Sequence, residues 1–165
     1  ETATLSWTQL QSFERNEAVR IIDHQTRTVV DPLSVSNLFL GHINERFPRV
    51  LNLVVGDPVH VEKLVKEILA SLPEEFSLKQ NYPNPFNPVT TIQFGLPQPS
   101  NVRLTIVNIL GQEVTELVND WRDMGFHQVR WAGVNDQGLP VSTGVYFSIL
   151  TDGQQVQIRK MLLVK

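Results

Sequence analysis

The chain has 165 residues, of which 41% are hydrophobic and 19% charged, and its formal net charge is −3. This composition is typical of a globular protein and excludes a disordered tail. The basic residues are scattered and no apolar run has the length of a membrane span, which argues against nucleic-acid binding and membrane insertion. The chain has no Cys, which excludes disulfides and thiolate-bound metals.

Residues 1–56 are predicted to form short β-strands. The strand-like segments are ATLSW, AVRIID, TRTVVD and RVLNLVVG. Because so few strands are rarely stable alone, we expect them to be the last strands of an upstream β-sandwich-like domain. The chain begins without Met, and its first Met is Met124, so we expect it to be part of a longer protein.

Residues 57–72 are predicted to form an amphipathic linker helix. Asp57 suits the N-cap, Pro58 suits the first helical position, and Pro73 ends the helix. Hydrophobic residues recur every three or four positions, at Val61, Leu64, Val65, Ile68 and Leu69. This apolar face needs a partner, either the preceding or the following strands. Membrane binding is a weaker alternative, because the polar face carries charges of both signs.

Residues 73–88 include QNYPNPFNP, in which three prolines fall within six residues. Proline fixes φ and lacks an N–H group, and it keeps the preceding residue out of the helical region. We therefore predict a rigid, extended linker at the start of the last domain, which would hold that domain apart from the preceding one.

Residues 89–165, together with FSLKQ before the prolines, are predicted to form a seven-stranded antiparallel β-sandwich of immunoglobulin or fibronectin type III style. The other strand-like segments are TTIQFGL, VRLTIVNIL, QEVTELV, HQVRW, VYFSIL and VQIRKMLLVK. Turn signals rich in Gly, Pro, Asn and Asp separate them.

The alternation along these strands predicts which side chains share a face. The expected sets are Val102, Leu104 and Ile106; Val129 and Trp131; and Val145, Phe147 and Ile149. In the last strand Val156, Ile158, Leu162 and Val164 are expected to point inward. Lys160 interrupts this inward row, either because it snorkels near the end of the sheet or because a bulge shifts the register.

The sequence offers no catalytic, cofactor or metal site. The four histidines are isolated, at His24, His42, His60 and His127, without metal-ligand spacing. No nucleophile elbow or phosphate-binding glycine loop is present, and VNDQG lacks the ligands of a calcium loop and predicts a plain turn.

Two of the three tryptophans are predicted to be core residues. Trp7 and Trp131 are in phase with neighbouring apolar residues. Trp121 falls in NDWRDMG, between predicted strands. It is expected either to cover an end of the sandwich or to be an exposed aromatic contact for a ligand or partner.

Four motifs follow one another in residues 73–165. They are LPEEFSLKQNYPNPFNPVTTIQFGLP, VRLTIVNILGQEVTELV, HQVRWAGVNDQGLPVSTGVYFSIL and QIRKMLLVK. In this order they strongly resemble the C-terminal sorting domain of type IX (Por) secretion cargo. They are also similar to the related immunoglobulin-like domain of flagellar hook-capping proteins.

The resemblance implies a non-enzymatic signal at the C-terminus of a protein secreted by a Gram-negative bacterium. Such cargo crosses the inner membrane by a signal peptide, and the folded sorting domain then directs it through an outer-membrane translocon. A sortase-like peptidase commonly removes the domain while attaching the cargo to the cell surface, and other cargo is released.

The resemblance also assigns sorting-motif residues by position. They are Pro83, Asn84, Pro85, Gly111, Val114, Leu117, Gly144, Val145, Tyr146, Gly153, Lys160 and Lys165. Ala132 departs from the aspartate that relatives often have, and the NDWRDMGFH loop has fewer glycines and prolines than is usual. The last strand is the expected recognition surface. It would offer an edge for β-augmentation, with Arg159, Lys160 and Lys165 supplying charge; alternatively, the lysines only protect that edge from aggregation.

Two other functions remain as alternatives. An immunoglobulin-like accessory module that binds carbohydrate or protein for a secreted enzyme predicts exposed, coplanar aromatic rings, which Trp121 and Tyr146 alone would not supply. A structural assembly domain like the hook cap requires homo-oligomeric contacts. The identity of the cargo depends on the polypeptide upstream of residue 1.

Overall fold

The structure is a computed structural model of the 165-residue chain, and it describes residues 2–6, 17–42 and 49–164. Trp7 and Lys165 lie outside the described residues. The chain divides into two compact units, unit 1 (residues 1–72) and unit 2 (residues 73–165). In the part of the chain that the structure describes, no helix is long and apolar enough to cross a membrane.

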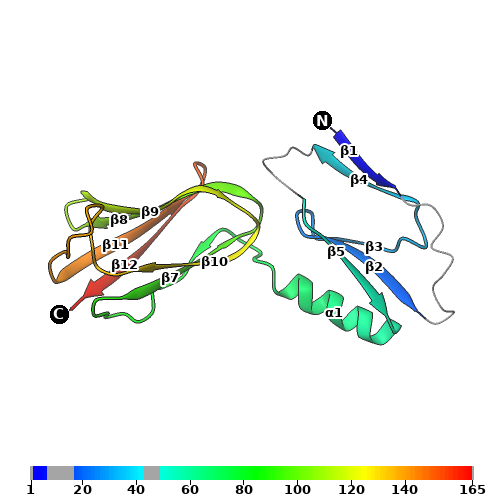
Figure 1. Ribbon diagram of the computed structural model, residues 1–165, viewed down its shortest axis with the longest axis horizontal. Helices are drawn as coiled ribbons and strands as arrows, with labels where there is room; N and C mark the ends of the chain where they lie inside the picture. The colour runs from blue at the N-terminus through cyan, green and yellow to red at the C-terminus, as the bar shows by residue number, and fades with distance from the viewer. Residues whose placement is uncertain (1, 7–16, 43–48, 165) are drawn as a thin grey trace. The chain divides into compact units, whose positions relative to one another are not determined.

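The described residues of unit 1 form two small antiparallel sheets and one helix (Figure 1). The first sheet pairs β1 (Thr2–Ser6) with β4 (Asn37–His42), and the second has the order β3 (Thr28–Val30), β2 (Ala18–Asp23), β5 (Leu51–Gly56). All four strand-like segments predicted for residues 1–56 overlap these strands.

The helix of unit 1, α1 (Pro58–Ala70), begins and packs as its sequence predicts. The Asp57 side chain accepts hydrogen bonds from the backbone N–H groups of Val59 (3.0 Å) and His60 (3.2 Å), which satisfies two donors that the first turn leaves free. The buried side chains of α1 pack in one cluster with Ile22 of β2 and Val54 of β5. The apolar face of the helix therefore contacts the strands that precede it.

A buried carboxylate joins the loops of unit 1. Asp23 is completely buried and accepts hydrogen bonds from the Arg49 guanidinium, from Thr26 Oγ1 (2.7 Å) and from the backbone N–H of Gln25 (3.0 Å). Burial alone would raise the pKa of Asp23, but the hydrogen bonds and the charge of Arg49 outweigh it and hold the pKa below its usual value. The carboxylate is therefore ionised and compensated within the fold.

Unit 2 is an antiparallel β-sandwich, as the sequence predicts, and Figure 1 shows its two sheets as layers. One sheet has the order β10 (Gly125–Trp131), β7 (Thr90–Leu96), β6 (Ser77–Leu78). The other has the order β12 (Val156–Leu163), β11 (Gly144–Thr151), β8 (Ser100–Asn108), β9 (Glu113–Arg122). Each predicted strand segment overlaps one of these strands, and the immunoglobulin or fibronectin style stays a prediction.

The core of unit 2 lies between the two sheets and is rich in aromatic side chains. Trp131 is 1% exposed, its ring centroid is 5.5 Å from that of Phe86, and the Tyr146 ring contacts it edge-on at 5.2 Å. Trp131 Nε1 donates a hydrogen bond to the carbonyl oxygen of Val134 (2.9 Å). Trp131 is therefore a core residue, as predicted. The core also holds the shared face predicted for β8, at Val102, Leu104 and Ile106.

The predicted inward row of β12 is wrong, whereas the residues predicted to share a face of β11 do share one. The side chains buried there are Tyr146, Ser148, Leu150, Met161 and Leu163. The set Val145, Phe147 and Ile149 therefore shares the outer face, and so does the predicted inward row, in which Val156 is 59% and Ile158 50% exposed. Lys160 belongs to this outward row, opposite Phe147, and the pairing shows no register shift, so neither snorkelling nor a bulge is involved. Both faces of β12 carry hydrophobic residues, and alternation alone therefore could not distinguish them.

The proline-rich segment is not an extended rod. Tyr82 pairs with Thr91, and Phe86 pairs with Leu163 of β12 through isolated bridges, so the segment is neither a helix nor a strand within a sheet. The peptide bonds before Pro83 and Pro85 are cis. The Phe86 side chain is 1% exposed and belongs to the core of unit 2. Burial of this large apolar ring explains why the segment packs against the sandwich rather than projecting from it.

Candidate functional site

The proline segment covers the outer edge of the last strand. The Phe86 backbone donates from its N–H to the Leu162 carbonyl oxygen (3.0 Å) and accepts from the Val164 N–H (2.9 Å). Asn84 adds a side-chain bond, because its Oδ1 accepts from the Leu162 N–H (2.9 Å). These atoms lie on the side of β12 that faces away from β11, where an additional strand would otherwise pair.

Side-chain amides extend the cover by one more rung. Gln80 Nε2 donates to the Lys160 carbonyl oxygen at 2.7 Å, and Asn84 Nδ2 reaches the same oxygen at 3.4 Å. We call Gln80, Asn84 and Phe86 the edge clasp. Because the clasp already occupies the edge at residues 160–164, the prediction that a partner strand pairs with this part of β12 is wrong.

A buried polar cluster fixes the loop that carries the clasp. Asn81 is 2% exposed, and its Nδ2 donates to the Pro83 carbonyl oxygen (3.0 Å) and to Thr90 Oγ1 (2.8 Å). Thr90 Oγ1 in turn donates to the Pro83 carbonyl oxygen (2.8 Å). This cluster satisfies the buried amide and holds the backbone near Pro83 and Asn84 in place, while the rings of Pro83 and Pro85 stay exposed.

The glycine motif forms the turn between β8 and β9. Asn108 Oδ1 accepts from the backbone N–H groups of Leu110 (2.9 Å) and Gln112 (3.1 Å), and Gly111 has a φ of 76° that other residues adopt only with strain. The turn presents Ile109 (70% exposed) and Leu110 (76% exposed) at its tip.

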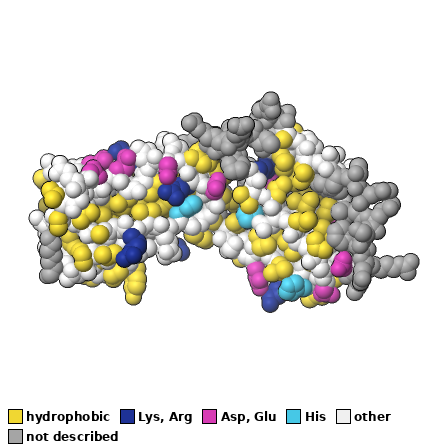
Figure 2. All heavy atoms as spheres, viewed as in Figure 1, with side chains coloured by type: hydrophobic (Ala, Val, Ile, Leu, Met, Phe, Trp, Pro, Cys, Tyr) yellow, Lys and Arg dark blue, Asp and Glu magenta, His cyan; other side chains and the backbone are white. Residues whose placement is uncertain are grey.

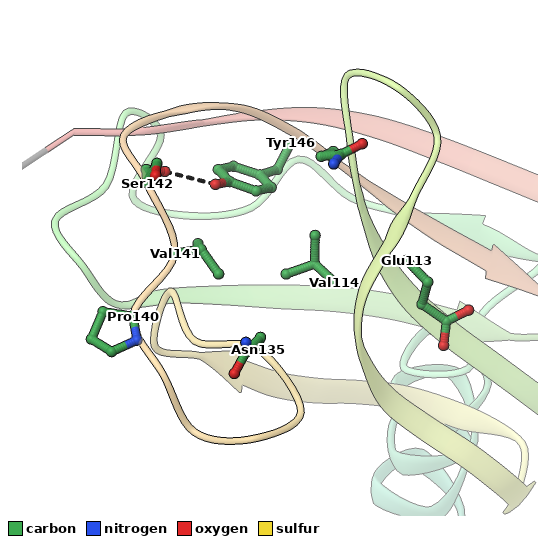
Figure 3. A pocket seen from close by; sticks show the side chains of 8 residues that line it. Glu113, Val114, Asn135, Pro140, Val141, Ser142 and Tyr146 are labelled. Carbon is green, nitrogen blue, oxygen red and sulfur yellow. Dashed lines mark hydrogen bonds between the residues drawn. The ribbon is translucent and has the colours of Figure 1, made fainter.

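A pocket of about 420 Å³ lies beside this turn. Its lining residues are Asn108, Glu113, Val114, Asn135, Pro140, Val141, Ser142 and Tyr146. Figure 3 shows the Val114 and Val141 side chains facing one another, with the Tyr146 hydroxyl bonded to the Ser142 carbonyl oxygen (2.6 Å). Burial raises the pKa of Tyr146, so its hydroxyl stays protonated and acts as a donor.

The polar groups of this pocket hold its loops in shape. Asn135 Oδ1 accepts from the backbone N–H groups of Gln137 (3.0 Å) and Leu139 (2.9 Å), which makes VNDQG the predicted turn. Among the described residues, no group of three or more His, Asp or Glu side chains is placed to hold a metal ion. The pocket therefore gathers Val114 and Tyr146 of the predicted motifs around hydrogen-bonded turns.

A charged cluster lies on the outer face of the same sheet, at β8 and β9. Arg103 Nη2 is 2.9 Å from a Glu113 carboxylate oxygen, and the Arg103 Nε contacts Glu116. The hydrogen bond from Arg103, followed by that from Asn119, lowers the pKa of Glu116. Both carboxylates are thus already engaged with the Arg103 guanidinium.

The remaining predicted residues lie apart from the clasp and the pocket. Gly153 (φ 87°) forms the β11–β12 turn, where Asp152 Oδ1 accepts from the Gln154 and Gln155 N–H groups (2.9 and 2.7 Å). The register places this turn at the opposite end of β11 from Gly144. Leu117 packs against the core.

Trp121 is not in a loop, as the sequence suggested. Because β9 continues as far as Arg122, Trp121 lies within this strand, opposite Asn101, and its side chain is half-buried. The interpretation of NDWRDMG as a loop is therefore wrong, and a contact between Trp121 and a ligand or partner stays a prediction.

The comparisons with known proteins agree with the motif order. The family model described as the secretion system C-terminal sorting domain matches residues 80–165, just over half of the chain. The chain belongs to this family. The resemblance to type IX secretion cargo is thereby confirmed, and the edge clasp, the pocket and β12 all lie within the matched region of this sorting domain.

Solved structures that match the chain include two proteins of Porphyromonas gingivalis. PorZ, an essential surface component of the type IX secretion system, is 19% identical with a TM-score of 0.38, over 58% of this chain and 12% of its own. Dimeric latent PorU is 10% identical with a TM-score of 0.43, over 99% of this chain and 18% of its own. The chain therefore spans less than a fifth of either protein. No curated protein gave a significant match.

Sequence reasoning did not identify Gln80, Asn81 and Phe86 as residues of the site. The signal available was the pair of amide side chains before the prolines, followed by a large aromatic residue. Amides can replace backbone partners at a strand edge, and an aromatic residue between prolines needs a place to be buried.

Proposed function

We propose that unit 2 is a non-enzymatic C-terminal sorting signal that directs a larger protein across the outer membrane of a Gram-negative bacterium by type IX secretion. The observation that carries the proposal is the family match over residues 80–165. The partners are the outer-membrane translocon, a sortase-like peptidase that removes the domain, and the upstream part of the same polypeptide. The cargo is delivered to the cell surface or released.

The geometry supports a domain that acts by being recognised in its folded form. Its aromatic core and edge clasp fix the shape of the last strand. A covered edge also lowers the tendency of a transported sandwich to pair with other chains before it reaches its partner. Sorting-signal domains form a non-catalytic family. In this proposal, any activity of the complete protein resides in the cargo part of the polypeptide.

The alternative of a carbohydrate- or protein-binding accessory module has no support from the family match. The aromatic residues named for it are poor stacking platforms, because Tyr146 is 7% exposed and Trp121 is half-buried in β9. In the proposed function both rings contribute to the folded sandwich.

A truncation of the last strand tests the sorting role. A reporter fused to the N-terminus of the chain should reach the cell surface, and the same fusion ending at residue 155 should remain in the periplasm. Because truncation also removes Met161 and Leu163 from the core, Leu104→Ala serves as a control that weakens the same core but keeps the strand. Surface delivery of the truncated fusion at the level of the full fusion would refute the role.

A further inference from the structure

The outer face of β11 and β12 carries a strip of hydrophobic side chains around one lysine. The strip consists of Val145, Phe147, Ile149, Val156, Ile158 and Leu162, with Lys160 among them. Opposite residues pair across the two strands, as Ile149 does with Ile158 and Phe147 with Lys160. Val156 and Ile158 are 59% and 50% exposed. We call this surface the outer strip.

The strip departs from the usual pattern of a solvent-facing sheet. One face of an antiparallel sandwich sheet packs on the core and the other is normally polar. In β12 the inner face buries Met161 and Leu163 in the core. The outer face also carries hydrophobic side chains, at Val156, Ile158 and Leu162. Figure 2 shows hydrophobic side chains (yellow) interspersed with polar ones (white) on the face turned to the viewer. Val156 and Ile158 are exposed and the other hydrophobic residues of the strip are half-buried, and neighbouring apolar side chains left open to solvent are typical of an interaction site.

The outer strip carries one positive charge, the side chain of Lys160, which is open to a partner. The ion pairs of the described residues do not include Lys160, whose side chain is exposed. The acidic residues on the same face of the sheet, Glu113 and Glu116, are held by Arg103 on β8. An incoming group therefore meets apolar side chains and the exposed ammonium group of Lys160.

We propose that the outer strip docks a protein component of the secretion machinery through an apolar segment that carries an Asp or Glu for Lys160. This inference rests on the proposed function and identifies the surface that is read. The edge clasp supports it indirectly, because pairing along residues 160–164 is closed, whereas the outer face of the same strand stays accessible.

Charge distinguishes this occupant from two others. A second copy bound about a two-fold axis through the strip would bring Lys160 close to its own symmetry mate, which is unfavourable. An anionic membrane would cover the whole face of the sheet, including Glu113 and Glu116 on β9, in a chain whose net charge is −3. An acidic, apolar protein segment that follows β11 and β12 meets Lys160 but stays clear of these carboxylates, because β8 separates β9 from β11.

The test compares surface delivery of a reporter fused to the full chain and to its variants. Ile158→Asp places a carboxylate in the strip, and Phe126→Asp is the matched control, since Phe126 is 53% exposed but lies in the other sheet. Ile158→Asp should lower delivery about tenfold, the effect of losing about 1.4 kcal/mol of binding, and Phe126→Asp should change it less than about twofold. Equal thermal midpoints of the purified variants confirm that folding is retained.

A charge series at Lys160 tests the acidic partner. Delivery should be equal with Lys or Arg at position 160, lower with Gln and lowest with Glu, because only Lys and Arg offer a cation. If Lys160→Glu and Ile158→Asp are delivered like the wild type, this inference fails while the proposed function stands. If the wild-type fusion itself stays in the periplasm, the proposed function fails and the inference fails with it.

Two measurements on the purified full chain test whether a membrane or a second copy of the chain binds the outer strip instead. Flotation with vesicles of phosphatidylcholine and phosphatidylglycerol should leave the protein unbound, and sedimentation should give a monomer. Vesicle binding that Lys160→Glu abolishes, or a dimer that Ile158→Asp dissociates, would overturn the assignment to a protein of the secretion machinery.

Discussion

Phe86 provides a sharp test of how the proline segment is held. Its ring is 1% exposed, lies 5.5 Å from the Trp131 ring, and belongs to the core between the two sheets of unit 2. Phe86→Ala deletes this ring but keeps both backbone hydrogen bonds to β12. A buried Phe replaced by Ala costs about 3–5 kcal/mol, from lost burial and from the cavity that remains. This is a large part of the roughly 5–15 kcal/mol that stabilises a typical domain.

The assay is urea unfolding of the full chain. Unfolding is monitored by the hydrogen-exchange protection of β12 amides, so that the signal comes from unit 2 alone. With an m value of about 1.5 kcal/mol/M, the expected loss lowers the midpoint by about 2–3 M. Tyr82→Ala is the control in the same segment, because Tyr82 is 82% exposed and a surface change costs within about 0.5 kcal/mol. If Phe86→Ala behaves like Tyr82→Ala, the segment is not anchored in the core and the reasoning is refuted.

Three further predictions concern other contacts. Asp57→Ala should destabilise α1 by about 1 kcal/mol through loss of the N-cap bonds, measured as a lower melting temperature of unit 1, and Asp57→Asn should restore most of it. Asp23→Asn should cost about 3–5 kcal/mol because it leaves Arg49 without its buried counter-charge. Since the folded-state pKa of Asp23 is lowered, its stabilisation is complete above about pH 5 and is lost as the pH falls below about 4. Thermal melts from pH 3 to 7 should therefore show a smaller acid loss in Asp23→Asn, and an equal loss would contradict this account. Tyr146→Phe should cost about 0.5–1.5 kcal/mol by removing the bond to Ser142, seen in the urea midpoint of unit 2; an unchanged midpoint would indicate that this bond contributes nothing.

Local signals in the sequence predicted the elements that depend on neighbouring residues. The spacing of Val61 and Val65 and the cap at Asp57 predict α1, because helix contacts repeat within four residues. Period-two alternation likewise predicts the strands of unit 2, and the phase of Trp131 with Val129 places the tryptophan in the core.

Contacts between distant residues were the ones that sequence reasoning missed. Asn84 bonds to Leu162, 78 residues later, and no local pattern specifies that pairing. The sequence also could not predict which face of β12 points to the core. Ile158 and Met161 are both apolar, and only the packed core distinguishes the outward from the inward side chain. The motif order succeeded because family membership depends on the whole arrangement rather than on any one contact.

The central claim is that unit 2 is the sorting signal that directs the protein across the outer membrane. Its most direct test is the fraction of a reporter found outside the cell when the reporter is fused to the full chain, in a type IX-competent strain and in the same strain with the translocon inactivated. The account predicts external reporter only in the competent strain, and none when the reporter lacks the chain. Equal external reporter in both strains would contradict it.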